Sequence, residues 1–373
     1  MNVSTRAAEI IGSHDDLASG SSEIISLLDL RAEGLVHSKF LRRPSSRNRS
    51  PHGIHTRVTQ MYSIVPKHYM TESLLTQYLL SPTPVVDVEL ADGREAIVHD
   101  PSQGMGGLLH PGVDMLIRPA RNKNGTLVGS TAVGKYGTPK CEFIAQLARV
   151  SEPENRDINP LGVWVGAHPS LGEKLTHEML KRGLVKELGE VVDIKREVAK
   201  VCGTDMRVDF VVTHKDGTRT ALEVKKVDNT DYNPAIIRVE GGVAKTKYWG
   251  YGIPYRRAAI FPWGGSQSKR GPDGEKIVPA SARAIKHIDE LTAVQTGEKL
   301  CQDGERLKAA ILFIIGRCDA QSLRSNKEAC PSFAKHLQKA NERGVKVLAY
   351  RVAWGTGDEE GVAFFDGALK VDL

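Results

Sequence analysis

Apolar and polar residues alternate with a period of two from Val85 to Val98, which indicates a β-hairpin. Val86 and Val88 share one face of the first predicted strand, and Asp92-Gly93 supplies residues favoured in a tight hairpin turn. The glycine-rich stretch 104–112 and an apolar run over 113–117 follow. Short strands separated by glycine turns predict a small β-barrel in this part of the chain.

The pattern changes in the second half of the chain, where longer amphipathic stretches alternate with continuous apolar runs. The expected elements are a helix over 169–183, strands over 207–213 and 218–227, a helix over 280–291, a strand over 309–315, a helix over 332–343 and a strand over 345–350. This order predicts an α/β sandwich with a mixed sheet.

The length of 373 residues favours two domains. Residues 1–34 are expected to form a frayed tail that ends in a helical turn over Ile24–Leu30. Pro153 lies among acidic residues and Asn in the segment 152–160, which we predict to be the linker. The predicted domains are therefore 35–151 and 160–373.

Composition places the chain among ordinary globular proteins, with 40% hydrophobic and 26% charged residues. The net charge of +6 permits a polyanionic partner without requiring one. No apolar run is long enough to span a membrane and no secretory h-region opens the chain, so an intracellular, soluble protein without a membrane partner is expected. The five cysteines show neither a C-x-x-C pair nor zinc spacing and are interpreted as reduced.

The chemistry-bearing residues lie on the two strands 207–213 and 218–227. Asp209 points away from the apolar face of its strand, and Glu223 and Lys225 point away from the apolar face of theirs. A three-residue loop, 215–217, with Gly217 in the left-handed conformation places Asp209 opposite Glu223. A two-residue loop would break this pairing, and only the longer loop keeps both apolar faces on one side of the sheet.

Two clustered carboxylates favour Mg²⁺ or Mn²⁺, which bind oxygen ligands and polarise a phosphodiester. Lys225 would orient the attacking water or neutralise transition-state charge. The alternative interpretation is a solvated hairpin face that merely alternates charged and apolar residues. The D…E-x-K pattern is short, so the rest of the chain must decide between the two.

Several further segments, taken together, resemble one known family. These are KFLRR at 39–43, the stretch from VELADG at 88–93 to GGLLHPG at 106–112, WVGAH at 164–168, RVDF at 207–210, EVK at 223–225, Lys286-His287, the stretch 313–317 and GVKVLAY at 344–350. In order and spacing they resemble the sugar fermentation stimulation protein family, SfsA. That resemblance implies an N-terminal OB-like β-barrel followed by a PD-(D/E)XK nuclease-like α/β domain.

The resemblance also implies roles for individual residues. Asp209 and Glu223 become metal ligands, Lys225 the catalytic lysine, and Glu178 the helical acid that completes the metal site. Glu173 lies on the same predicted helix, and either helical acid is also interpretable as a solvated carboxylate.

Lys286 and His287 are implied as phosphate contacts, although a lone histidine is also interpretable as a structural residue. Relative to the family, the chain carries insertions at about 48–84 and at about 228–279. Gly316 stands where the family has a glutamine before Arg317.

Basic residues that flank the predicted barrel strands predict a track for the phosphates of a nucleic acid, with DNA as the expected polymer. These residues are Lys39, Arg42, Arg43, Arg47, Arg118 and Arg121. The leading hypothesis is a DNA-binding protein with a Mg²⁺- or Mn²⁺-dependent nuclease site. The alternative is a non-catalytic DNA-binding regulator that retains the nuclease fold, and a protein-interaction module is a third possibility.

Overall fold

The computed structural model describes residues 24–42, 85–101, 108–134, 137–152, 155, 159–232, 255–262, 281–302, 304–328 and 330–373, and the backbone of 238–239, 242–243, 268–270 and 276–279. The described residues fall into two compact units. One unit contains the described residues of Asp29–Pro169 together with a short hairpin, β11 (Arg238–Val239) and β12 (Gly242–Val243). The other contains the described residues up to Leu28 and most of those from Ser170 onward.

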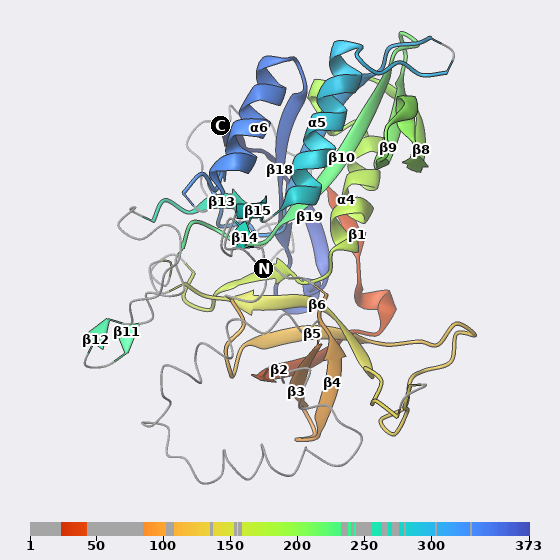
Figure 1. The fold of residues 1–373 in the computed structure, drawn as a ribbon. Coiled ribbons are helices and arrows are strands. Elements are labelled where there is room, and N and C mark those ends of the chain that lie inside the picture. Colours follow the sequence, from red (N-terminus) through yellow and green to blue (C-terminus); the bar gives the residue numbers. More distant parts are fainter. Residues whose placement is uncertain are drawn as a thin grey trace. The chain divides into compact units, whose positions relative to one another are not determined.

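The first unit is a closed barrel, drawn mainly in orange and yellow in Figure 1. Its strands are β2 (Val36–Arg42), β3 (Val85–Leu90), β4 (Glu95–His99), β5 (Asp114–Pro119), β6 (Phe143–Val150) and β7 (Val163–Gly166). They pair in the order β4-β3-β2-β5-β6-β7, and an additional β4–β6 pairing closes the barrel. Its core includes Phe40, Val88, Met115 and Leu147, each at most 2% exposed. This architecture confirms the predicted OB-like barrel.

The predicted hairpin is the β3–β4 pair. Val86 pairs with Val98, and Val88 pairs with Ala96. Gly93 adopts φ +81°, a left-handed conformation that costs glycine little. The barrel sheet continues beyond the predicted linker, because β7 hydrogen-bonds to β6.

The second unit is built on a seven-stranded mixed sheet in the order β1-β19-β18-β16-β10-β9-β8. Its strands are β1 (Ser26–Asp29), β8 (Val191–Ala199), β9 (Arg207–His214), β10 (Arg219–Val227), β16 (Lys308–Ile315), β18 (Lys346–Trp354) and β19 (Val362–Ala368). β16 runs parallel to both β10 and β18, whereas β9 is antiparallel to β10. The sheet is therefore mixed, as predicted.

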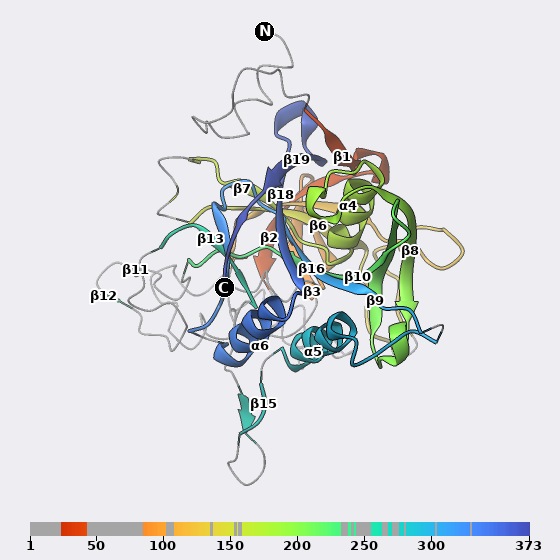
Figure 2. The same ribbon diagram turned by 90° about the horizontal axis from the view of Figure 1, so that it is seen from above.

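Helices cover both faces of this sheet. They are α4 (Ser170–Lys181), α5 (Ala282–Thr296) and α6 (Pro331–Glu342). A Cβ added at Gly172 of α4 would lie 3.6 Å from Val224 Cγ1 on β10, whereas His287 of α5 bonds to the neighbouring Glu223. Since adjacent strand residues point to opposite faces, α4 and α5 lie on opposite sides of the sheet, as Figure 2 shows.

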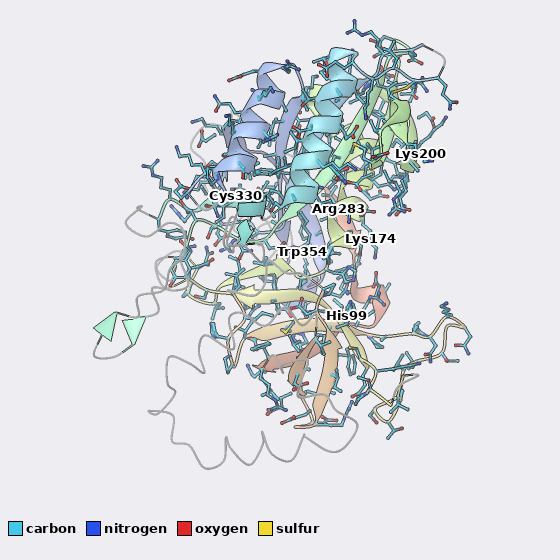
Figure 3. The ribbon with its side chains drawn as sticks, in the orientation of Figure 1. His99, Lys174, Lys200, Arg283, Cys330 and Trp354 are labelled. Atoms are coloured by element: carbon cyan, nitrogen blue, oxygen red, sulfur yellow. A yellow bond between two sulfur atoms is a disulfide. The ribbon has the colours of Figure 1, made fainter. Side chains whose placement is uncertain are left out.

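Smaller sheets complete the described part of this unit. A three-stranded sheet joins β13 (Ala258–Phe261), β17 (Ser322–Ser325) and β20 (Lys370–Asp372), and a hairpin joins β14 (Ser268–Arg270) and β15 (Lys276–Pro279). Trp354 of β18 donates from Nε1 to the Gly316 carbonyl (3.2 Å), and Cys330 is buried just before α6 (Figure 3). No helix in the described ranges is both long and apolar enough to cross a membrane.

Two expectations at the level of local structure are wrong. The predicted helical turn over Ile24–Leu30 is instead strand β1, in which Leu27 is buried. The backbone N–H of Phe365 donates to the Ile25 carbonyl (2.9 Å), so residues far away in sequence select the extended conformation. A short apolar stretch such as Ile24–Leu30 does not distinguish the two conformations by itself.

The second wrong expectation concerns the cysteines. A disulfide joins Cys202 and Cys301, which are 99 positions apart in the sequence. Cys318 is a free cysteine. Because the fold alone brings the paired thiols together, their spacing along the chain held no signal of the pairing.

Candidate active site

The β9–β10 hairpin has the predicted register. Ala221 pairs with Val211, and Leu222 with Phe210; the pairing ends one position before Glu223 and Asp209, and this register assigns both acids to the same face of the sheet. The loop contains three residues, because the His214 N–H donates to the Thr218 carbonyl (2.8 Å). Gly217 closes it at φ +82°, as the predicted bulge requires. Both acids therefore lie on one face of the sheet.

Asp209 is a partly buried carboxylate whose charge is disfavoured. Its Oδ2 accepts a hydrogen bond from the Val224 N–H at 2.6 Å. Burial, followed by the charge of Glu223, raises the pKa of Asp209 to about 6, although the Val224 hydrogen bond and Lys225 oppose the rise. Negative charge is thus concentrated at this point of the hairpin, and a cation would relieve it.

Glu223 is only 3% exposed and is held on one side by two cationic or hydrogen-bonding neighbours. Its Oε1 accepts from Lys225 Nζ and lies 2.6 Å from His287 Nδ1. Burial acts to raise the pKa of Glu223, but the His287 hydrogen bond and the Lys225 charge outweigh it, so this pKa lies below its ordinary value. Glu223 therefore stays ionised at neutral pH.

The second carboxylate oxygen of Glu223, Oε2, is relevant to metal binding. Oε2 is buried and has no hydrogen-bond partner within the described residues. A buried carboxylate oxygen without a partner is costly, and a cation would satisfy it. The residues present fit Mg²⁺ or Mn²⁺, because such ions are commonly held by one or two carboxylates and retain several waters. Within the described ranges, no group of three or more His, Cys, Asp or Glu residues is arranged around one metal position.

The two acids of α4, Glu173 and Glu178, have different electrostatic partners. The charge of Glu173 contributes to the raised pKa of Asp209. Glu178 instead forms ion pairs along its own helix with Lys181 (3.1 Å) and Arg182 (3.6 Å). Residues five apart on a helix point in different directions, so Glu173 and Glu178 have different surroundings. Gly172 is the small residue through which the start of α4 approaches β10.

The two residues predicted to contact phosphate on α5 have different environments. His287 is 8% exposed and bonds to Glu223, so the structure makes it a positioning residue for that carboxylate. Lys286 is exposed, and its Nζ lies 3.4 Å from Asp205 Oδ2. Only Lys286 presents its charge at the surface.

The basic residues predicted for the barrel also differ in their availability. Arg42 is 12% exposed at its side chain and forms ion pairs with Asp87 (3.0 Å) and Glu95. Arg42 is therefore part of the barrel's own packing. Lys39 pairs with Asp114 (2.7 Å) at the surface.

Arg118 and Arg121 lie at the end of β5 and just beyond it. Arg118 pairs with Glu33 (2.9 Å), and Arg121 is exposed and donates to the Gly125 carbonyl (2.8 Å). Arg43 and Arg47 lie outside the described residues. Of the predicted barrel arginines that the structure describes, Arg121 is exposed, whereas Arg42 and Arg118 are half-buried.

Lys226 and Arg317 have structural roles beside the site. Lys226 points to the α4 side of the sheet, and its ammonium is buried in an ion pair with Asp228. Arg317 is fully buried and donates to both oxygens of Asp319 at 2.6 Å. Neither side chain faces the acids of the hairpin.

Comparisons with known proteins agree with this architecture. The family model described as the sugar fermentation stimulation protein RE domain matches residues 170–236 and 279–358. A sugar fermentation stimulation protein homolog from Maricaulis maris is 27% identical over 268 residues, which cover 71% of this chain and 82% of that protein. A homolog from Synechococcus sp. is 27% identical over 269 residues, covering 72% of this chain and 81% of that protein.

A solved structure shows the same fold. The structure of Pyrococcus furiosus SfsA in complex with Ca²⁺ matches with a TM-score of 0.55 and 17% identity, and the match covers 94% of this chain and 100% of that chain. The family model, the relatives and this fold lead to one conclusion: the chain belongs to the sugar fermentation stimulation protein (SfsA) family.

Proposed function

We propose that this protein binds nucleic acid, with DNA as the expected polymer, and hydrolyses phosphodiester bonds with Mg²⁺ or Mn²⁺ at Asp209, Glu223 and Lys225. The observation that carries the proposal is the buried, unpartnered Oε2 of Glu223 opposite a second carboxylate whose ionisation is suppressed. A solvated hairpin face would instead expose its carboxylates to water.

Each residue of the site has a defined task in this proposal. Asp209 and Glu223 hold the cation through carboxylate oxygens, and the Glu223–His287 hydrogen bond fixes the orientation of one of these carboxylates. A bound Mg²⁺ or Mn²⁺ supplies Lewis-acid polarisation of a phosphate oxygen and a lowered pKa for a coordinated water. The Lys225 ammonium, next to Glu223, faces the negative charge that develops on the phosphate.

The related structure supports a divalent cation. The Pyrococcus furiosus SfsA structure is a complex with Ca²⁺, an ion that takes oxygen ligands, including carboxylates. Two facing carboxylates in this chain offer the same class of ligand.

A cleavage assay tests the proposal. End-labelled single- and double-stranded DNA should be cut by the purified protein with Mg²⁺ or Mn²⁺ and left intact with EDTA. Cleavage that persists in EDTA would exclude the metal-dependent mechanism. Binding without cleavage under any divalent cation would favour the second candidate, a regulator that retains the nuclease fold.

One observation favours that second candidate. Oε1 of Glu223 already accepts from Lys225 and His287, so one of the two oxygens of this carboxylate is engaged without a metal. In a regulator these bonds would stabilise the fold and would have no part in catalysis.

DNA binding is expected to weaken steeply as salt rises, because lysine and arginine contacts release counterions from the phosphates. Replacing exposed Arg121 and Lys123 with alanine should make the slope of log K against log salt shallower by about 1 per lost contact. Fluorescence anisotropy over a salt series measures this slope. The matched control replaces exposed Lys335 and Lys339 of α6, which removes the same charge. An equal change in both double variants would remove the barrel from the interface.

A further inference from the structure

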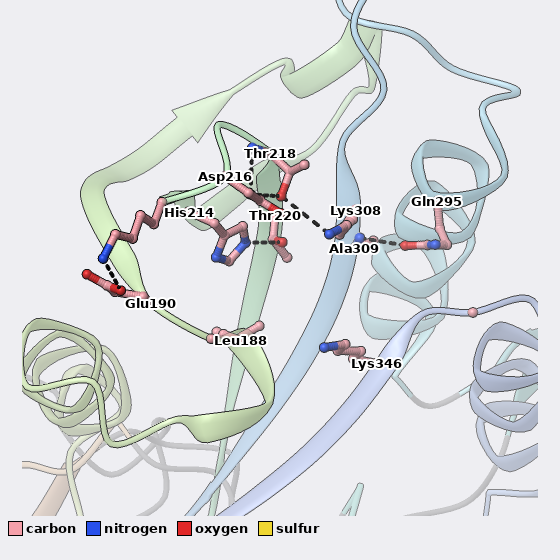
Figure 4. A pocket seen from close by; sticks show the side chains of 13 residues that line it. Leu188, Glu190, His214, Asp216, Thr218, Thr220, Gln295, Lys308, Ala309 and Lys346 are labelled. Carbon is pink, nitrogen blue, oxygen red and sulfur yellow. Dashed lines mark hydrogen bonds and ion pairs between the residues drawn. The ribbon is translucent and has the colours of Figure 1, made fainter.

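A cavity lies at the end of strands β9 and β10 that is remote from the candidate active site. Its volume is about 540 Å³, and its polar lining includes His214, Thr220, Lys308 and Lys346 (Figure 4). These four residues come from β9, β10, β16 and β18. A cavity of this size falls within the range that holds small ligands.

Thr220 of the lining lies on the sheet face opposite to Glu223, whereas Gln295 of the lining comes from α5. Thr220 alternates in phase with Leu222 and Val224, which face α4, and Lys308 pairs directly with Thr220. Thr220 and Glu223 are three positions apart on β10, a distance of about 10 Å along the strand. The cavity therefore needs an explanation that does not involve the metal ligands.

His214 supplies a buried polar atom without a partner. Its ring is 7% exposed, and Nε2 lies 2.7 Å from Thr220 Oγ1. Nδ1 is buried and finds no hydrogen-bond partner among the residues that the structure describes. Burial, followed by the charge of Lys308, holds the pKa of His214 below its ordinary value, so the ring is neutral at pH 7. If the Thr220 hydroxyl donates to Nε2, then Nδ1–H is available to an acceptor in the cavity.

Two lysines of the lining have only neutral partners within the described residues. Lys308 Nζ donates to Thr218 Oγ1 (3.3 Å), and Lys346 Nζ donates to the Glu187 carbonyl. Lys215, in contrast, forms an ion pair with Glu190 at 2.9 Å on the rim. Neither ammonium has a direct ion pair within the described residues, although Lys308 also interacts with the charge of Asp216, and a ligand anion would add direct ion pairs.

Asp216 is the other acid of the lining, and its carboxylate already accepts two hydrogen bonds. Its Oδ1 accepts from the Thr218 N–H (2.9 Å) and from the Thr218 hydroxyl (2.7 Å). These bonds hold the pKa of Asp216 below its ordinary value. Asp216 therefore stabilises the hairpin loop, and its charge also interacts with Lys308 without a direct ion pair.

We infer that this cavity binds the phosphate group of a small phosphate monoester, with Lys308, Lys346 and the Nδ1–H of His214 as its donors. Lysine binds phosphate as a point charge, and donors that come from three different strands surround a tetrahedral anion better than a planar one. The remaining volume accommodates the organic part of the ligand. The inference does not depend on the proposed nuclease activity.

Calorimetric titration of the full chain with inorganic phosphate and with adenosine 5′-monophosphate tests the inference. The buffer contains EDTA, so that phosphate cannot bind through a divalent cation, and chloride keeps the ionic strength constant. Saturable one-to-one binding is expected for both probes. Lys308→Gln and Lys346→Gln should each weaken binding by about tenfold or more, since each removes a charged donor.

Lys215→Gln is the matched control, because it removes a lysine from the same lining whose charge Glu190 already satisfies. Its affinity should stay within about twofold of the wild type, as an exposed ion pair contributes little. Two results would overturn the inference: neither probe binds in a saturable manner, or Lys215→Gln weakens binding as much as Lys308→Gln does. Circular dichroism of all three variants would show whether a loss reflects unfolding.

Discussion

Replacing Lys225 with alanine is expected to reduce DNA cleavage by about 10²–10³-fold, because one preorganised electrostatic group typically contributes about 3–4 kcal/mol to transition-state stabilisation. DNA affinity should change little, since the side chain is only 18% exposed and its ammonium is turned toward Glu223. Single-turnover cleavage and anisotropy binding, measured on the same preparation, separate the two effects.

The adjacent lysine is not a neutral control for this experiment. Breaking the buried Lys226–Asp228 ion pair would cost about 3–5 kcal/mol of stability. Lys195→Ala is a better control, because Lys195 is exposed on β8 of the same sheet. A wild type that binds DNA but cleaves nothing, and whose binding is unaffected by Lys225→Ala, would establish the regulator hypothesis in place of the nuclease.

Asp209→Asn is expected to stabilise the metal-free protein at pH 8 by up to about 3 kcal/mol, the equivalent of a pKa raised from 3.8 to about 6. Between pH 3.8 and about 6, the folded state binds more protons at Asp209 than the unfolded state does. Stability therefore falls as pH rises from about 4 to about 6 and stays lower above that range. The neutral amide avoids this cost and can still accept the Val224 N–H.

Urea denaturation of wild type and Asp209→Asn in EDTA, at pH 4 and pH 8, measures the difference. The gain should be present at pH 8 and nearly absent at pH 4. Addition of Mg²⁺ should then stabilise the wild type more than the variant, since only the wild type keeps both carboxylates. A variant that is less stable than the wild type at both pH values would show that ionised Asp209 does not destabilise the folded protein.

The hairpin that carries the site was predictable because its signals are local. Alternation fixes the faces of both strands, and only the three-residue loop keeps both apolar faces on one side of the sheet; Gly217 is compatible with that loop but does not select it. The same reasoning placed α4, α5 and α6 to within a few residues of their ends, apart from the later C-terminus of α5.

The features that escaped prediction depend on contacts between distant residues. Strand β1 is extended because β19 lies beside it, and the Cys202–Cys301 pair forms because the fold brings two loops together. The direction in which each acid of α4 points depends on the packing of the helix against β10 at Gly172, which the sequence pattern does not show. Arg42 forms ion pairs within the barrel, because Asp87 and Glu95 lie on neighbouring strands. The distribution of charges along the sequence does not show that these residues are neighbours.

The most direct test of the central claim is a Mn²⁺ titration followed by the electron paramagnetic resonance signal of the free ion. The claim is that Asp209 and Glu223 jointly hold one cation through carboxylate oxygens, including the unpartnered Oε2 of Glu223. Wild type should bind one Mn²⁺ that Mg²⁺ displaces, and both Asp209→Asn and Glu223→Gln should lose this site. A Mn²⁺ site that both variants retain at unchanged affinity would contradict the claim.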